Sequence, residues 1–102
     1  MYIHAQHRDD PKVQELRREA GAWLRALREE KGLSQRQLAE QVGAGFYTFI
    51  SQLETGRGRI PPDRYEAWAN TLGVPAAQFV RTLLKFYDPV TYRILFTDSG
   101  RC

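Results

Sequence analysis

The sequence of 102 residues predicts an all-α fold, a bundle of five helices with a helix-turn-helix, followed by a C-terminal extension. Three observations predict this fold. Apolar residues recur at spacings of three and four, capping residues and prolines precede the candidate helices, and glycines follow them. We therefore predict a disordered tail at 1–9, a domain at 10–87 with the helix-turn-helix at about 33–56, and an extension at 88–102.

The first predicted helix spans about 11–31. Asp10 and Pro11 suit its N-cap and first helical position, and Gly32 suits its end. Gly21 lies inside this helix, and the sequence leaves open whether it weakens the helix or bends it. The apolar stripe of the helix consists of Val13, Leu16, Ala20, Leu24 and Leu27.

Two short helices around a glycine turn are predicted next. Ser34, followed three residues later by Gln37, forms a capping box that begins the first helix of the pair. Leu38 and Val42 lie one turn apart and give this helix a small apolar face. Gly43 suits the left-handed conformation that ends a helix, and a tight connection follows it.

The second helix of the pair separates apolar from polar residues. Phe46, Ile50 and Leu53 recur at i, i+4 and i+7 and predict its buried stripe. The opposite face lacks acidic residues and consists of Thr48, Ser51, Gln52 and Thr55, with Tyr47 near its edge. Gly56 is predicted to end the helix. Two helices with one polar face form the plan of a helix-turn-helix, whose second helix enters the DNA major groove.

Prolines and glycines divide the rest of the chain into further helices. One is predicted from about Pro62 to Leu72, and another from Pro75 to about Tyr87. Asp88 and Pro89 then supply another N-cap pair, which favours a short helix over the following residues, 90–96. The same residues are rich in β-branched and aromatic types, so a strand is the alternative.

The segment resembles the Xre/Cro family of bacterial and phage repressors, whose core has the pattern L-S-Q-x-x-L-A, a turn, and I-S-x-I/L-E-x-G. The resemblance covers roughly 20–80 and implies a five-helix repressor-like bundle. It departs from the family in one extra residue between Gly43 and Glu54 and in aromatic residues at the start of the second helix. The matching residues are Leu33, Ser34, Gln35, Leu38, Ala39 and Gly43, then Ile50, Ser51, Leu53, Glu54 and Gly56.

Double-stranded DNA is the partner that this pattern predicts. Gln52 and Thr48 can hydrogen-bond base edges, and the arginines of the GRGR segment suit phosphates. Gln35, at the start of its helix, suits a phosphate contact through its side chain and backbone N–H. The alternative for Gln35 and the two arginines is an ordinary solvated side chain. For Gln52 the alternative is a contact with the backbone or water, and for Thr48 it is a phosphate or solvent. The predicted DNA-binding residues are Gln35, Arg36, Tyr47, Thr48, Ser51, Gln52, Arg57 and Arg59.

A homodimer is predicted because one recognition helix discriminates only a few base pairs, and the resembled family dimerises on palindromes. The C-terminal end carries more apolar surface than a small domain normally exposes. The alternative is that this segment folds back onto its own subunit. The predicted dimer residues are Phe86, Tyr87, Val90, Tyr92, Ile94, Leu95 and Phe96.

Composition limits the other function classes. The net charge of +3 is compatible with a polyanionic partner. Cys102 is the only cysteine, and His4 and His7 have no matched ligands nearby, so we predict no disulfide, metal or cofactor. No nucleophile has an identifiable base, which argues against an enzyme. No apolar run reaches the length of a membrane span, and no signal-peptide core is present, so we expect a cytoplasmic protein, nucleoid-associated when bound to DNA.

The predicted function is a sequence-specific transcriptional regulator, a repressor rather than an activator. Two alternatives remain. One is an antitoxin-type protein that binds DNA and neutralises a partner protein, for which the apolar C-terminal end would be the contact. The other is a protein-interaction module that has lost DNA binding, which the aromatic start of the second helix would favour.

Overall fold

The computed structural model describes residues 10–98, and every regular element within that range is helical. The predicted all-α fold is therefore confirmed. The tail at 1–9, with His4 and His7, and the terminal Cys102 lie outside the described residues. The elements are α1 (Pro11–Glu30), α2 (Gln35–Val42), α3 (Tyr47–Glu54), a 3₁₀ turn η2 (Pro62–Arg64), α4 (Tyr65–Leu72), α5 (Ala76–Tyr87), α6 (Pro89–Arg93) and a π-helical turn η3 (Ile94–Asp98).

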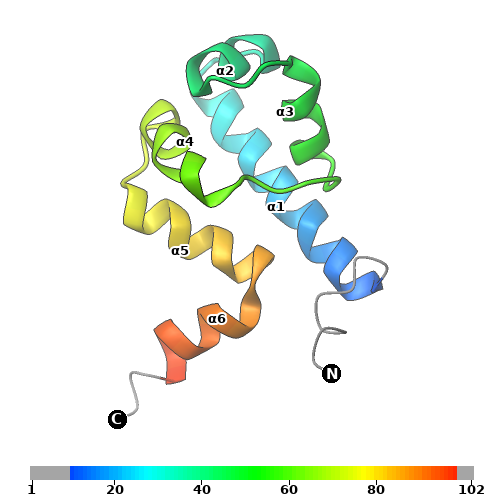
Figure 1. Ribbon diagram of the computed structural model, residues 1–102, viewed down its shortest axis with the longest axis vertical. Coiled ribbons are helices and arrows are strands. Elements are labelled where there is room, and N and C mark those ends of the chain that lie inside the picture. The colour runs from blue at the N-terminus through cyan, green and yellow to red at the C-terminus, as the bar shows by residue number, and fades with distance from the viewer. Residues whose placement is uncertain (1–9, 99–102) are drawn as a thin grey trace.

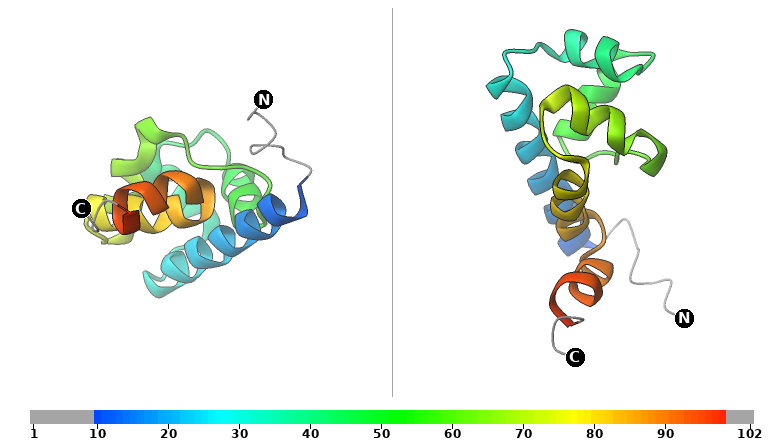
Figure 2. Two further views of the ribbon diagram at one scale, coloured as in Figure 1. Left: turned by 90° about the horizontal axis from the view of Figure 1, so that it is seen from below. Right: turned by 90° about the vertical axis from the view of Figure 1, so that its left-hand side faces the viewer.

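The long helix α1 is the support on which the other helices are arranged (Figure 1). Both α3 and α5 pack directly against α1. The helix α4 packs against both α2 and α5 and so connects the helix-turn-helix with α5. The last two elements, α6 and η3, lie at the end of the molecule opposite α2 and α3 (Figure 2). The helix-turn-helix and the C-terminal segment therefore occupy opposite ends.

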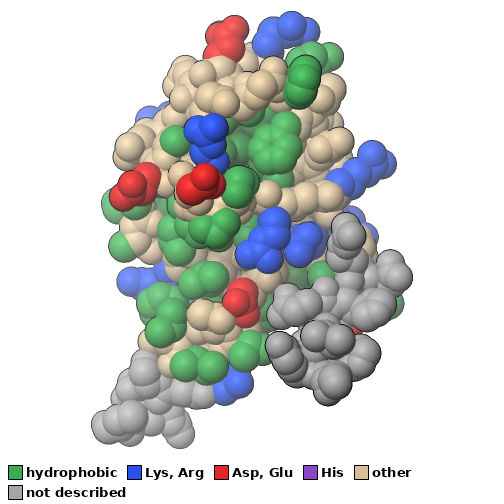
Figure 3. Space-filling model, viewed as in Figure 1, with side chains coloured by type: hydrophobic (Ala, Val, Ile, Leu, Met, Phe, Trp, Pro, Cys, Tyr) green, Lys and Arg blue, Asp and Glu red, His purple; other side chains and the backbone are tan. Residues whose placement is uncertain are grey.

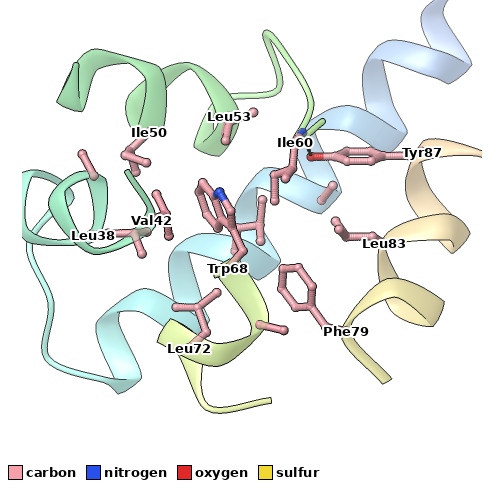
Figure 4. Packing of buried hydrophobic residues seen from close by; sticks show 14 residues of the cluster. Leu38, Val42, Ile50, Leu53, Ile60, Trp68, Leu72, Phe79, Leu83 and Tyr87 are labelled. Atoms are coloured by element: carbon pink, nitrogen blue, oxygen red, sulfur yellow. Dashed lines mark hydrogen bonds between the residues drawn. The ribbon is translucent and has the colours of Figure 1, made fainter. Parts of the chain in front are cut away.

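Trp68 lies at the centre of the hydrophobic core (Figure 4). Its ring is buried between residues of the helix-turn-helix on one side and Phe79 and Leu83 of α5 on the other. Ile60, from the loop after α3, is also completely buried in this cluster. Burial of these large side chains supplies the main driving force for folding, because it removes most of their apolar surface from water.

Gly21 marks a close crossing of two helices. The helix α1 continues through this residue, which faces the end of α3. A Cβ atom at this position would lie 2.3 Å from the carbonyl oxygen of Glu54 and 2.6 Å from that of Leu53. Only glycine lets the backbones approach so closely. Its cost in helix propensity, about 1 kcal/mol relative to alanine, is thus explained by packing.

The prediction that Phe46 belongs to the buried stripe of α3 is wrong. The helix begins at Tyr47, and Phe46 is its N-cap, with extended backbone angles of φ −133° and ψ 137°. A residue outside the helix does not share the helical period, so the Phe46 side chain points away from the core and is 75% exposed. Phe49 instead packs against the core beside Ile50 and Leu53.

The C-terminal segment is helical, as favoured, and not a strand. Asp88 caps α6 because its carboxylate accepts hydrogen bonds from the backbone N–H of Thr91, at 3.1 Å, and from the Thr91 hydroxyl, at 2.7 Å. The cap and Pro89 at the first helical position together start the helix.

Candidate nucleic-acid interface

The first helix of the motif begins and ends as the sequence predicts. The hydroxyl of Ser34 accepts from the backbone N–H of Gln37 at 3.0 Å, and the Gln37 side chain accepts from the backbone N–H of Ser34 at 2.8 Å. This reciprocal box satisfies two N–H groups that a helix start leaves unpaired. At the other end Gly43 takes the left-handed conformation, with φ 75°, and turns the chain toward α3.

A buried ion pair fixes the end of α3. The guanidinium of Arg28 donates to both carboxylate oxygens of Glu54, at 2.6 and 3.1 Å, and also to the backbone oxygen of Leu33, at 2.8 Å. The Glu54 side chain is only 4% exposed. The hydrogen bond with Glu54 raises the pKa of Arg28 above its usual value. The pair joins the C-terminal ends of α1 and α3 and removes the only acidic side chain of α3 from the surface.

Gln35 extends the same network. Its side-chain N–H donates to a Glu54 oxygen at 3.1 Å, and the residue is half-buried. The first residue of α2 is thereby attached to the last residue of α3. The sequence pattern predicts a phosphate contact for Gln35 and does not indicate this bond within the motif.

The outward face of α3 is polar. Thr48 and Gln52 are exposed and lie one turn apart, and Ser51 beside them is half-buried. Thr55 is exposed as well, but its hydroxyl donates back to the helix, to the Ser51 carbonyl at 2.9 Å. Thr48 and Gln52 are therefore the side chains best placed to bond an external ligand.

Arg36 and Tyr47 meet across the start of the motif. The Arg36 guanidinium lies over the Tyr47 ring, 4.5 Å from its centre, and both side chains are exposed. A cation over an aromatic face is attracted by the ring's negative charge density, so the contact orients both groups. Arg36 and Tyr47, both among the predicted DNA-binding residues, therefore contact each other at the N-terminal end of α3.

The loop after α3 holds the two arginines of the GRGR segment. Gly56 begins it with φ 84°, and a Cβ there would lie 2.9 Å from the backbone of Arg18 in α1, so only glycine fits. Arg57 is exposed, whereas the half-buried Arg59 lies over the ring of Tyr87, 4.8 Å from its centre. In Figure 3 basic side chains gather on the face below this loop.

Tyr87 secures the loop from the other side. Its hydroxyl oxygen accepts from the backbone N–H of Ile60 at 3.2 Å, and Arg17 of α1 also lies over its ring. Burial raises the pKa of Tyr87, because the charged phenolate is poorly solvated there. The sequence pattern placed Tyr87 in the dimer group, yet in this chain it is a buried support of the arginine loop.

The other residues predicted for dimerisation fall into two groups. Phe86 is half-buried, with its ring 6.2 Å from that of Trp23, and Tyr92 is half-buried against Phe96, with ring centres 5.2 Å apart. The remaining side chains lie on α6 and η3 and are 42–52% exposed; they are Val90, Ile94, Leu95 and Phe96.

The helix-turn-helix domain family matches residues 19–83 of the chain. The chain belongs to this family. The match begins within α1, includes the whole motif and ends within α5. It supports DNA binding and a role in transcription regulation. No curated protein matches the chain.

Residues 10–98 hold no group of three or more histidine, cysteine, aspartate or glutamate side chains placed to bind a metal ion. None of the helices in the same range is both long enough and apolar enough to cross a membrane.

Proposed function

We propose that this protein is a sequence-specific, double-stranded DNA-binding transcriptional regulator of the Xre/Cro type, acting as a repressor rather than an activator. One observation carries the proposal: α3 presents the exposed Thr48 and Gln52 on a surface from which Glu54 has been withdrawn. A recognition surface for DNA must offer hydrogen-bonding groups without negative charge, because phosphates surround every base edge.

The side chains of this surface suit the major groove. Gln52 can bond an adenine through its N6 and N7 groups, and Thr48 can bond several base edges. The exposure of Arg57, in the loop after α3, supports a phosphate contact, which would position the helix without reading sequence. The Arg36–Tyr47 pair and Ser51 would contact the backbone or base edges at the same end of the groove. The Arg59 guanidinium lies over the Tyr87 ring, so we expect Arg59 to contribute less to phosphate binding than Arg57.

A homodimer on a palindromic operator is part of the proposal. Specific sites must be discriminated from a whole genome of competing sequence, and a single short helix reads too few base pairs to do so. The exposed apolar side chains of α6 and η3 form the proposed two-fold contact. Sedimentation at micromolar concentration checks it: a monomer that is unchanged by deleting 89–102 would contradict the dimer.

The deciding experiment is selection of bound duplexes from a random pool at physiological salt. Enrichment of a two-fold palindrome would establish a dimeric sequence reader and supply the operator. Weak binding that depends on salt and selects no sequence would contradict the proposal. In that case the apolar C-terminal segment would favour the antitoxin alternative, which co-purification with a small stable partner would identify.

A further inference from the structure

Phe46 is the most exposed large hydrophobic side chain in the described part of the chain, at 75%. It stands at the N-cap of α3, immediately before Tyr47, where the recognition helix begins. In Figure 3 hydrophobic side chains stand out from the surface in the region where α3 begins. An isolated exposed phenylalanine needs no explanation by itself, but two features of this position are unfavourable for stability.

The first unfavourable feature is the missing side-chain cap. Serine, threonine, asparagine or aspartate at an N-cap accepts a hydrogen bond from an unpaired N–H of the first turn, and α3 has no side-chain cap of this kind. The second is the exposure of a full aromatic ring. Departures from local rules concentrate at functional sites, where the residue is selected for contact with a ligand. Phe46 is therefore a candidate contact residue.

The surroundings of Phe46 indicate the kind of contact. It borders an open hollow of about 350 Å³ together with Arg36, Glu40 and Tyr47. One cation, Arg36, and one carboxylate, Glu40, both line this hollow, so its lining carries no net charge. The rest of its lining is small and apolar, namely Ala39, Ala44 and Gly45. An uncharged, partly apolar group fits such a surface best.

We propose that Phe46 contacts the C5 methyl group of a thymine in the major groove. This inference rests on the proposed function and names a base that the site reads. The N-terminal residues of a recognition helix approach the base edges, and the thymine methyl is the apolar group that the bases of unmodified DNA present in the major groove. At the N-cap of α3, where a polar side chain is usual, Phe46 would thus serve as an apolar reader.

The test uses the selected operator and the full chain. Each thymine is replaced in turn by uracil, in both half-sites, and the dissociation constant is measured by fluorescence anisotropy. For the unmodified protein, one position should lose affinity about fourfold per half-site, the equivalent of about 0.8 kcal/mol for one methyl-sized contact. Phe46→Ser should bind thymine and uracil operators equally at that position.

Phe46→Ser is informative because serine is a favourable N-cap, so this variant should be at least as resistant to urea as the original. Loss of thymine discrimination then cannot result from unfolding. Gln52→Ala is the control variant, since it should lose a different base preference and keep the uracil effect. At the contacted position, 5-methylcytosine should bind better than cytosine only when Phe46 is present.

Three results would overturn the inference. If no thymine is sensitive to uracil although an operator is selected, the contact does not exist and the proposed function stands. If Phe46→Ser retains the sensitivity, another residue reads the methyl group. If no sequence is selected at all, the proposed function fails together with this contact, and an unaltered weak DNA affinity of Phe46→Ser would direct Phe46 to a protein partner.

Discussion

The hydroxyl of Tyr87 holds the backbone N–H of Ile60 across 27 positions of sequence, at 3.2 Å. The last residue of α5 thereby fixes the loop that leaves α3 (Figure 4). The Arg59 guanidinium lies over the ring of the same tyrosine. Tyr87 therefore supports both the buried residue of the loop, Ile60, and its basic residue, Arg59. The position of the proposed phosphate contacts therefore depends on α5, which immediately precedes the C-terminal segment.

Tyr87→Phe should lower the free energy of unfolding by about 1–3 kcal/mol, because it leaves the buried N–H of Ile60 without its acceptor. Urea unfolding at neutral pH measures this change. Tyr92→Phe makes the same chemical change on α6, outside the buried cluster, and should cost less. Equal effects of the two substitutions would show that the Ile60 hydrogen bond contributes nothing specific.

The stability of the protein should also depend on pH through Tyr87. Burial raises the pKa of Tyr87, so the folded state keeps the phenol neutral to higher pH than the unfolded chain does. Its contribution to stability is fully present below the ordinary tyrosine pKa of about 10 and is lost as the pH rises through the folded value. Between pH 9 and pH 11, roughly around that pKa, Tyr87→Phe should therefore lose stability less steeply than the original protein. Parallel curves would contradict the prediction.

Glu54→Gln should destabilise the protein by about 3–5 kcal/mol, because it removes the buried counter-charge that is hydrogen-bonded to the Arg28 guanidinium. Arg25→Gln is the control, because it breaks an ion pair on α1 without removing a partner of Arg28. Arg25 pairs with Glu29 at 2.9 Å, both side chains are more than half exposed, and such pairs contribute at most about 1 kcal/mol. Urea midpoints of the two variants give the comparison, and similar midpoints would exclude a supporting role for the Arg28–Glu54 pair.

Some of these features follow from local sequence and some do not. The Ser34 box, the Gly43 turn and the Asp88 cap were predictable, because each is decided by residues within one helical turn. The role of Gly21 and the support that Tyr87 gives to Ile60 depend on contacts between distant segments, which periodicity does not contain. For Phe46, the predicted period was extended one residue too far, across the true start of α3.

Gly21→Ala should destabilise the protein by about 1–3 kcal/mol although alanine is the better helix former, because the new methyl group would overlap the α3 backbone. Gly45→Ala is the control, since no atom lies within 4 Å of a Cβ at that position. Thermal unfolding compares them. A Gly21→Ala protein at least as stable as the original would mean that α1 and α3 can separate without cost.

Arg57→Ala should weaken DNA binding uniformly across sequences and reduce the slope of log affinity against log salt by about 1, as expected for one lost phosphate contact. Lys31→Ala is the control and also removes one positive charge. Lys31 follows the C-terminal end of α1 and its side chain lies against Gly73, so this variant should leave the slope unchanged. Titrations at several salt concentrations distinguish the variants. A changed base preference in Arg57→Ala would indicate base contact instead.

Gln52→Ala and Thr48→Ala should each lose base preference at defined operator positions, by about 1–3 kcal/mol, because these are the side chains proposed to bond base edges. Both side chains are exposed, so neither substitution should lower stability. Thr55→Ala is the control for Thr48→Ala. Its hydroxyl is already bonded to the Ser51 carbonyl, so its removal should leave the selected sequence unaltered. Selection from a random pool, repeated with each variant, gives the preferences position by position. If Thr55→Ala alters the operator and Thr48→Ala does not, α3 enters the groove through its C-terminal end, and the Arg36–Tyr47 pair lies outside the interface.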